Sequence, residues 1–152
     1  MCKALFVLVC LIQTGHAWKY CSYFDQDSND FLVQDFEAMP WNRDEIHLRL
    51  NGRLGSTIYP ASISASGKTH LQPTMRIKIF KKSSGEEIYS NVKALNNYTN
   101  SSLLDGDDAT IKVPIRFGLD KKLNNGDYYV VQMVIMKRCG KEVTCVENNL
   151  LV

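Results

Sequence analysis

The sequence contains few of the residues that enzymes use for nucleophilic or metal-dependent chemistry. Histidine occurs only three times in 152 residues, as His16, His47 and His70, and the Gly-x-Ser-x-Gly motif of serine hydrolases is absent. No group of histidine, cysteine and acidic residues has the spacing of a zinc site. Cys139 follows two basic residues that favour a thiolate, but no catalytic constellation accompanies it. We therefore predict no catalytic residue, no metal and no cofactor, and we expect a protein that is not an enzyme.

A strong excess of charge of either sign is also absent. The sequence has 18 lysine and arginine residues against 16 aspartate and glutamate residues, which gives a net charge of +2 at pH 7. Nucleic-acid-binding domains carry a basic patch, so we expect no nucleic-acid partner. The one acidic cluster, from Asp25 to Asp30, lacks the glycine and the glutamate that a calcium-binding loop requires. It is typical of a solvated loop.

Long apolar runs are absent except at the start of the chain. There, Lys3 precedes an apolar run from Ala4 to Ile12, and small residues follow as far as Ala17. This run is much shorter than the roughly 20 residues that span a bilayer, and the pattern is typical of a secretory signal peptide. We expect residues 1–17 to be that signal peptide and residues 18–152 to form one secreted domain. The sequence does not distinguish an extracellular from a lysosomal role.

The rest of the chain shows a repeated alternation of polar and apolar residues. Segments 45–50, 75–79 and 111–117 alternate with period two, which places successive side chains on opposite faces of a strand. Segment 128–136 contains only one polar residue, Gln132, and predicts a strand that is covered on both faces.

Turn signals separate these predicted strands. Asn51-Gly52 can turn or bend the chain, and Gly140 can return it for a last strand that ends at Val152. Pro114 lacks an amide donor, so its strand is expected at a sheet edge or at a bulge. Several short strands without a convincing helix predict an antiparallel β-sandwich, with a β-barrel as the structural alternative.

The cysteines predict one disulfide. Cys2 and Cys10 leave with the signal peptide, so Cys21, Cys139 and Cys145 remain, an odd number for an oxidising compartment. A disulfide from Cys21 to either late cysteine would close a loop of more than a hundred residues. In the chain-entropy model such a disulfide stabilises the folded protein by roughly 4 to 5 kcal/mol. A bridge across the turn between the two late cysteines is the alternative, and the residues alone leave this choice open.

Three short motifs resemble the ML lipid-recognition domains, in particular their ganglioside-activator branch. Trp18-Lys19-Tyr20-Cys21 resembles the Trp-x-x-Cys opening of that family. Asn125-Gly126-Asp127-Tyr128 resembles the Gly-x-Tyr before its penultimate strand, and the segment from Gly140 to Cys145 is similar to its Gly-Lys-x-x-x-Cys hairpin.

The resemblance implies an immunoglobulin-like two-sheet β-sandwich that binds one lipid in an apolar cavity between its sheets. It also implies that the first and last cysteines of the secreted domain pair, which here are Cys21 and Cys145, and it leaves Cys139 unpaired. The additional cysteines that usually hold the middle loops of the family are absent from this chain.

Residues on the apolar faces of the predicted strands are the candidate lining of this cavity. An acyl chain gains roughly 0.8 kcal/mol for each methylene that it buries, so such a cavity needs apolar area and no nucleophile. Each of these side chains could equally be ordinary core. The sequence does not show which face of segment 128–136 points inward, since both are apolar. The candidate lipid-binding residues are Ile46, Leu48, Leu50, Ile58, Met75, Ile77, Ile79, Val113, Ile115, Phe117, Val131, Met133 and Ile135.

The expected function is that of a secreted, non-enzymatic lipid-binding and transfer protein. We expect it to hold an acyl chain, glycolipid or sterol, with phospholipid among the candidates, and to present it to a membrane, a receptor or a lipid hydrolase. The alternative is a secreted immunoglobulin-like interaction module with a filled core and no lipid.

Two polar loops complete the expectations. Asn97-Tyr98-Thr99 and Asn100-Ser101-Ser102 are glycosylation sequons, which predict glycans at Asn97 and Asn100. Lys68 and His70 lie in a loop rich in proline, glycine and small polar residues, where we expect them to be solvated.

Overall fold

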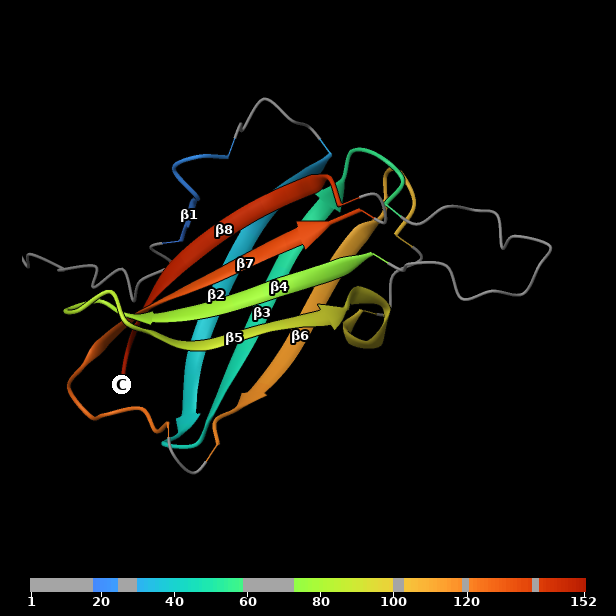
Figure 1. Ribbon diagram of the computed structural model, residues 1–152. Helices are drawn as coiled ribbons and strands as arrows, with labels where there is room; N and C mark the ends of the chain where they lie inside the picture. Colours follow the sequence, from blue (N-terminus) through green and yellow to red (C-terminus); the bar gives the residue numbers. More distant parts are fainter. Residues whose placement is uncertain (1–17, 25–29, 59–72, 100–102, 119–120, 138–139) are drawn as a thin grey trace, which may run out of the picture.

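The described chain forms eight strands and one short 3-10 helix (Figure 1). The computed structural model describes residues 18–24, 30–58, 73–99, 103–118, 121–137 and 140–152. The elements are β1 (Lys19–Tyr20), β2 (Phe31–Asn42), β3 (Glu45–Leu54), β4 (Thr74–Lys81), β5 (Glu87–Ala94), η1 (Leu95–Tyr98), β6 (Asp108–Arg116), β7 (Tyr128–Met136) and β8 (Glu142–Leu151). None of the helical turns in these residues is long and apolar enough to cross a bilayer.

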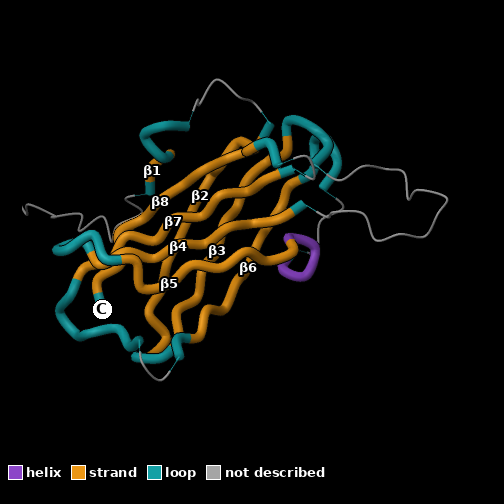
Figure 2. The backbone as a smooth tube through the Cα atoms, viewed as in Figure 1, coloured by secondary structure: helices purple, strands orange, loops and turns teal. Residues whose placement is uncertain are grey.

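The strands form two antiparallel sheets, which lie over one another as separate layers (Figure 2). One sheet has the order β1-β8-β7-β4-β5 and the other has the order β2-β3-β6. Neither sheet closes on itself, so the barrel alternative is wrong, and the expected immunoglobulin-like two-sheet antiparallel β-sandwich is confirmed. β6 is a sheet edge, as Pro114 predicted.

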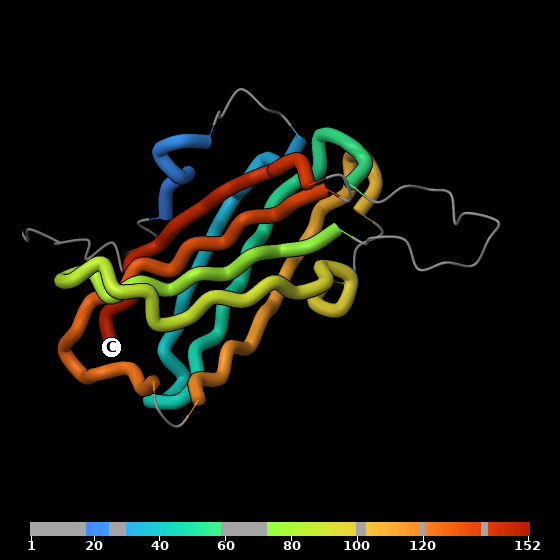
Figure 3. The backbone as a smooth tube through the Cα atoms, viewed as in Figure 1, coloured from blue at the N-terminus to red at the C-terminus, as the bar shows by residue number. Residues whose placement is uncertain are grey.

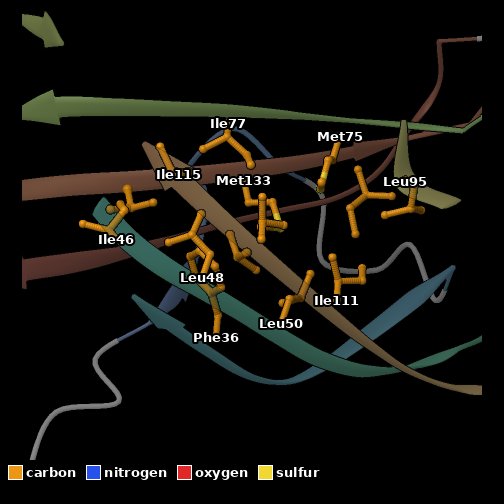
Figure 4. Packing of buried hydrophobic residues seen from close by; sticks show 14 of the residues in the cluster. Phe36, Ile46, Leu48, Leu50, Met75, Ile77, Leu95, Ile111, Ile115 and Met133 are labelled. Atoms are coloured by element: carbon orange, nitrogen blue, oxygen red, sulfur yellow. The ribbon is translucent and has the colours of Figure 1, made fainter. Parts of the chain in front are cut away.

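The alternating segments occupy the middle of the sandwich in the expected orientation. In β3, Ile46 pairs with Ile115 of β6 and Leu48 pairs with Val113. Antiparallel partners point to the same side of a sheet, so these apolar rows form one continuous inner face. The second sheet faces it with apolar rows from β4 and β7 (Figure 4).

β7 presents its odd-numbered residues to the core, which answers a question that the sequence left open. Val131, Met133 and Ile135 are fully buried and belong to the main core cluster. Val134 lies on the outer face and is also buried, because it packs in a separate cluster with Cys21 and Cys145. The outer face of β7 is thus covered at that point by a disulfide, whereas Tyr128 at the start of the strand is exposed.

The disulfide joins Cys21 to Cys145 over a sequence separation of 124 residues. It links the segment after β1 to β8, and the Cys21 amide also donates to the Cys145 carbonyl oxygen over 2.9 Å. The pairing that the family resemblance implied is therefore confirmed, and the alternative bridge across the late turn is wrong. Cys139 lies outside the described residues.

Gly52 lies within β3 and does not turn the chain. It pairs with Val33 on one side and Ala109 on the other, and the strand continues to Leu54. A Cβ atom at this position would collide with the Phe31 ring and would lie 2.6 Å from the carbonyl oxygen of Leu32. The glycine is therefore required by close packing of β2 against β3.

Candidate functional site

The thirteen predicted lining residues all belong to one buried cluster between the sheets. The most exposed member, Phe117, shows 9% of its surface, and most of the others show 1% or less. Inward orientation of every predicted residue is therefore confirmed. Contact with a lipid stays a prediction, because a filled core and a lipid site both require this burial.

The described side chains between the two sheets are closely packed. Side chains such as Leu50, Ile77 and Met133 have essentially no water-accessible surface, so no space the size of a water molecule adjoins them. Figure 4 shows side chains of the two sheets pointing toward one another. A lipid between these described inner faces would need them to move apart, and the two lateral edges of the sandwich differ in how they hold the sheets together.

The edge formed by β2 and β8 is tied by hydrogen bonds. Asn148 is buried on the inner face of β8, and its side-chain amide donates to the backbone carbonyl oxygen of Phe36 in β2 over 2.7 Å. The Val33 amide of β2 donates to the Tyr20 hydroxyl of β1 over 3.2 Å. These bonds cross from one sheet to the other, so they hold the two sheets together at this edge.

Asn148→Ala tests this tie. We expect the free energy of unfolding to fall by about 2 kcal/mol, because the Phe36 carbonyl oxygen would remain buried without its donor. Urea unfolding of the variant measures the loss. Asn149→Ala, which removes the same side chain from the exposed neighbouring position, is the control and is expected to change little. Equal effects of both variants would contradict the role of Asn148.

The opposite edge, formed by β5 and β6, has a different composition. We call this edge the seam. Pairing of β5 with the inward row of β4 places Tyr89, Asn91 and Lys93 on the inner side of β5. Asn91 is exposed and the other two are half-buried, so the inner side of this strand is polar.

A ring contact and a backbone bridge between described residues close the seam. The rings of Tyr89 and Phe117 meet edge to face, with centroids 6.0 Å apart. At the other end, Thr99 forms an isolated bridge with Ile111 of β6. A T-shaped ring contact is worth about 0.5 to 1.5 kcal/mol beyond its buried area, similar to one hydrogen bond. Among the described residues of the seam, no buried polar side chain ties the sheets as Asn148 does at the other edge.

Among the described residues, one hollow lies at an end of the sandwich and another lies beside η1 and the outer side of β6, and polar side chains line both. One of about 380 Å³ is lined by Lys81, Glu86, Ile88, Lys121, Lys122, Asn124 and Tyr129. A hydrogen bond to Asp127, together with the charge of that carboxylate, raises the pKa of Lys81, so this ammonium stays protonated at neutral pH. The other hollow, of about 500 Å³, is lined by Asn97, Tyr98, Thr99, Thr110 and Lys112. Neither hollow has the apolar character predicted for the cavity.

His47 lies on the polar face of β3 and is half-buried. Its ring is stacked on Trp41, with centroids 4.8 Å apart, and its Nε2 lies 2.8 Å from Glu45. Residues outside the candidate list include Phe36, Leu95 and Ile111, which are fully buried in the same cluster, and alternation of segment 111–117 already placed Ile111 on the apolar face. Phe36 was obscured by a register shift between Val33 and Asp35, which moves the buried positions of β2 from odd to even numbers.

The remaining predicted sites are only partly described. Asn97 is exposed on η1, where a glycan has room, whereas Asn100 lies outside the described residues, as do Lys68 and His70. Within the described part of the chain, no group of three or more histidine, cysteine or acidic side chains is arranged to hold a metal ion.

Comparison with known proteins gives similarity to solved structures. No family model matches the sequence, and no curated protein matches it. Among solved structures, the chain is similar to chicken MD-1 complexed with lipid IVa, at 14% sequence identity and a TM-score of 0.46, over 86% of this chain and 83% of that chain. Membership of the ML family, and of its ganglioside-activator branch, stays a prediction.

Proposed function

We propose that this protein binds one lipid between its two sheets and carries it without changing it chemically. The observation that supports this most is the contrast between the two edges of the sandwich. A large and mostly apolar interior is tied at the β2–β8 edge and bordered at the seam by a strand whose inner side is polar. Polar residues on the inner side of an edge strand discourage pairing with other chains, and they also suit a lipid that has an apolar body and a polar head.

Opening of the sheets and entry of the lipid are coupled in this proposal. Parting the sheets exposes the inner faces of β3, β4, β6 and β7 to water, which is unfavourable by roughly 25 cal/mol for each Å² of apolar surface. An acyl chain or sterol that fills the gap removes this cost, at roughly 0.8 kcal/mol for each buried methylene. The open form is therefore populated only with a lipid of sufficient length inside it.

The polar head of the lipid lies at the seam. Tyr89, Asn91 and Lys93 supply a hydroxyl, an amide and an ammonium along the inner side of β5. These groups can donate hydrogen bonds to phosphate, carboxylate or sugar oxygens while the apolar body lies deeper. Phospholipid, glycolipid and sterol remain the candidate cargoes.

The setting of this activity also belongs to the proposal. Residues 1–17 are a signal peptide and residues 18–152 are the mature domain, which works outside the cell or in the lysosome. The lipid is delivered to a membrane, a receptor or a lipid hydrolase. No catalytic step on the lipid is proposed.

A filled-core interaction module is the second candidate function. The observation that favours it is the close packing of the described side chains between the two sheets. In that case the sheets never part, and partners bind only to the outer surface.

Native mass spectrometry of the secreted protein, followed by solvent extraction, separates the two candidates. We expect a lipid adduct in a ratio of one to one, and extraction then identifies the class of cargo. A mass without adduct that stays unchanged when phospholipids, glycolipids and sterols are offered would support the filled-core module and overturn the proposal.

Hydrogen exchange locates the opening. We expect amides of β5 and β6 to exchange faster than those of β7, since edge strands open more easily than a strand paired on both sides. Lipid loading is expected to slow exchange in β5 and β6 more than in β2 and β8. Protection confined to the β2–β8 edge would place the entrance there and contradict the seam.

A further inference from the structure

One end of the sandwich carries an exposed tryptophan among basic residues. We call this end the Trp41 tip and define it by Met39, Trp41, Arg43, Arg116, Lys121 and Lys122. Trp41 is 69% exposed, the highest value among the large apolar side chains described, and Met39 is 47% exposed. Both lie near the end of β2, where the chain turns into β3 (Figure 3).

The exposed position of Trp41 is held by its neighbours. Its ring lies parallel to that of His47, with an interplanar angle of 6° and centroids 4.8 Å apart. Glu45 Oε1 lies 2.8 Å from Nε2 of His47, and Glu45 Oε2 lies 3.4 Å from Nε of Arg116. One face of the indole is therefore covered by the imidazole of His47, and the rest of the ring is exposed to solvent.

Backbone hydrogen bonds bring a second basic segment to the same end. The Leu123 amide donates to the carbonyl oxygen of Arg43 over 3.3 Å, and the Phe117 amide donates to that of Asp44 over 2.8 Å. Lys121 and Lys122 consequently lie beside the turn between β2 and β3.

Two of the basic residues at the tip form ion pairs with carboxylates, and two do not form such pairs among the described residues. Lys122 pairs with Asp44 over 3.6 Å, as Arg116 does with Glu45. Arg43 and Lys121 are exposed, and no carboxylate of the described residues pairs with either of them. Asp120, outside the described residues, adds one negative charge nearby in sequence.

We propose that the Trp41 tip docks this protein on a phospholipid bilayer that carries anionic headgroups. Tryptophan favours the interface between headgroups and acyl chains, where its amphipathic ring has both an apolar and a polar environment. Arg43 and Lys121 then face the anionic headgroups, whose surface potential attracts each basic side chain.

Docking at this end would bring a lipid carrier to its membrane, so the role assigned to docking rests on the proposed lipid-binding function. Phe117, whose amide binds the Asp44 carbonyl oxygen, is also one of the two rings that close the seam. A bilayer in contact with the tip therefore lies next to one end of the seam, where lipid would leave or enter.

Tryptophan fluorescence provides a direct test. The full sequence has only two tryptophans, so Trp18→Phe leaves Trp41 as the single reporter. On vesicles of phosphatidylcholine with phosphatidylserine, we expect a blue shift of Trp41 emission and quenching by shallow brominated lipids. Trp41→Ala, in the otherwise natural chain, is expected to weaken vesicle binding about tenfold in a sedimentation assay.

Charge and position have their own controls. Arg43→Gln combined with Lys121→Gln is expected to weaken binding to the phosphatidylserine vesicles about 25-fold and to leave binding to phosphatidylcholine alone unchanged. Leu32→Ala removes an exposed apolar side chain from the other end of β2, 47% exposed, and is expected to have no effect on docking. An equal loss in Leu32→Ala and Trp41→Ala would overturn the assignment of the tip.

A soluble short-chain phosphatidylcholine, offered below its micelle concentration, separates this inference from the lipid-binding proposal. If it binds while vesicles leave Trp41 emission unchanged, the docking inference is overturned and the interior site stands. If it does not bind while docking depends on Trp41, the tip stands and the interior site fails. Trp41-dependent self-association without vesicle binding would assign the tip to a second copy and overturn the inference.

Discussion

Val113→Asp is expected to reduce lipid binding more than 100-fold. Val113 lies on the inner face of β6, which is one of the two seam strands, and its side chain is 1% exposed. It pairs with Leu48 of β3. A carboxylate at this position would face the acyl chain in an apolar interior, and burial of such a charge without a partner costs several kcal/mol. Titration with a fluorescent fatty acid, or native mass spectrometry with the natural cargo, measures the loss.

Lys112→Asp is the matched control, because it places the same charge on the outer face of the same strand. We expect it to bind lipid as the natural chain does. Val113→Thr keeps the shape of valine, so this variant is expected to fold. We expect its hydroxyl group to weaken lipid binding about fivefold. A loss of binding in this variant is therefore separate from a failure to fold. Undiminished binding by a folded Val113→Asp protein would remove the inner face of β6 from the site.

Removal of the disulfide is expected to have the largest effect on stability. The bridge between Cys21 and Cys145 spans 124 residues and ties the first strand to the last. In the chain-entropy model, loss of a loop of this length lowers the free energy of unfolding by about 5 kcal/mol. That is a large part of the 5 to 15 kcal/mol typical of a whole domain.

Cys21→Ala combined with Cys145→Ala tests this expectation. Chemical unfolding of the variant and of the natural chain, each with and without reductant, gives the difference in free energy. Cys139→Ala is the control that keeps the bridge. A loss below about 1 kcal/mol in the double variant would mean that β1 and β8 hold together without the disulfide.

Alternation along single strands predicted the inner faces well because period-two patterning is local. Ile46, Leu48 and Leu50 must share one face of any extended strand, whatever the rest of the chain does. The same logic failed for β2, in which a register shift moves Phe36 to the core, since a bulge depends on the partner strand. It also gave no answer for β7, where apolar residues occupy both faces.

The residues that shape the candidate functions were beyond such patterns. In the sequence, Asn148 is a polar residue of the last strand with no sign of burial. In the structure it is buried, and its side chain donates a hydrogen bond to Phe36, which lies 112 positions earlier in the chain. Tyr89 and Phe117 close the seam only because β5 and β6 are the edges of different sheets. Trp41 gave no signal, and its support by His47 depends on the pairing of β2 with β3.

The sequence by itself determined that this protein is built of strands with one apolar face each, and its motifs indicated which two cysteines pair. Those properties follow from side-chain chemistry at short range and from the resemblance of short motifs. Only the tertiary structure decided which edge of the sandwich is tied by a buried amide, which edge has a polar inner side, and which end presents tryptophan among basic residues. The reason is physical: edges and ends are made by residues far apart in the chain, and their contacts exist only after the two sheets have packed.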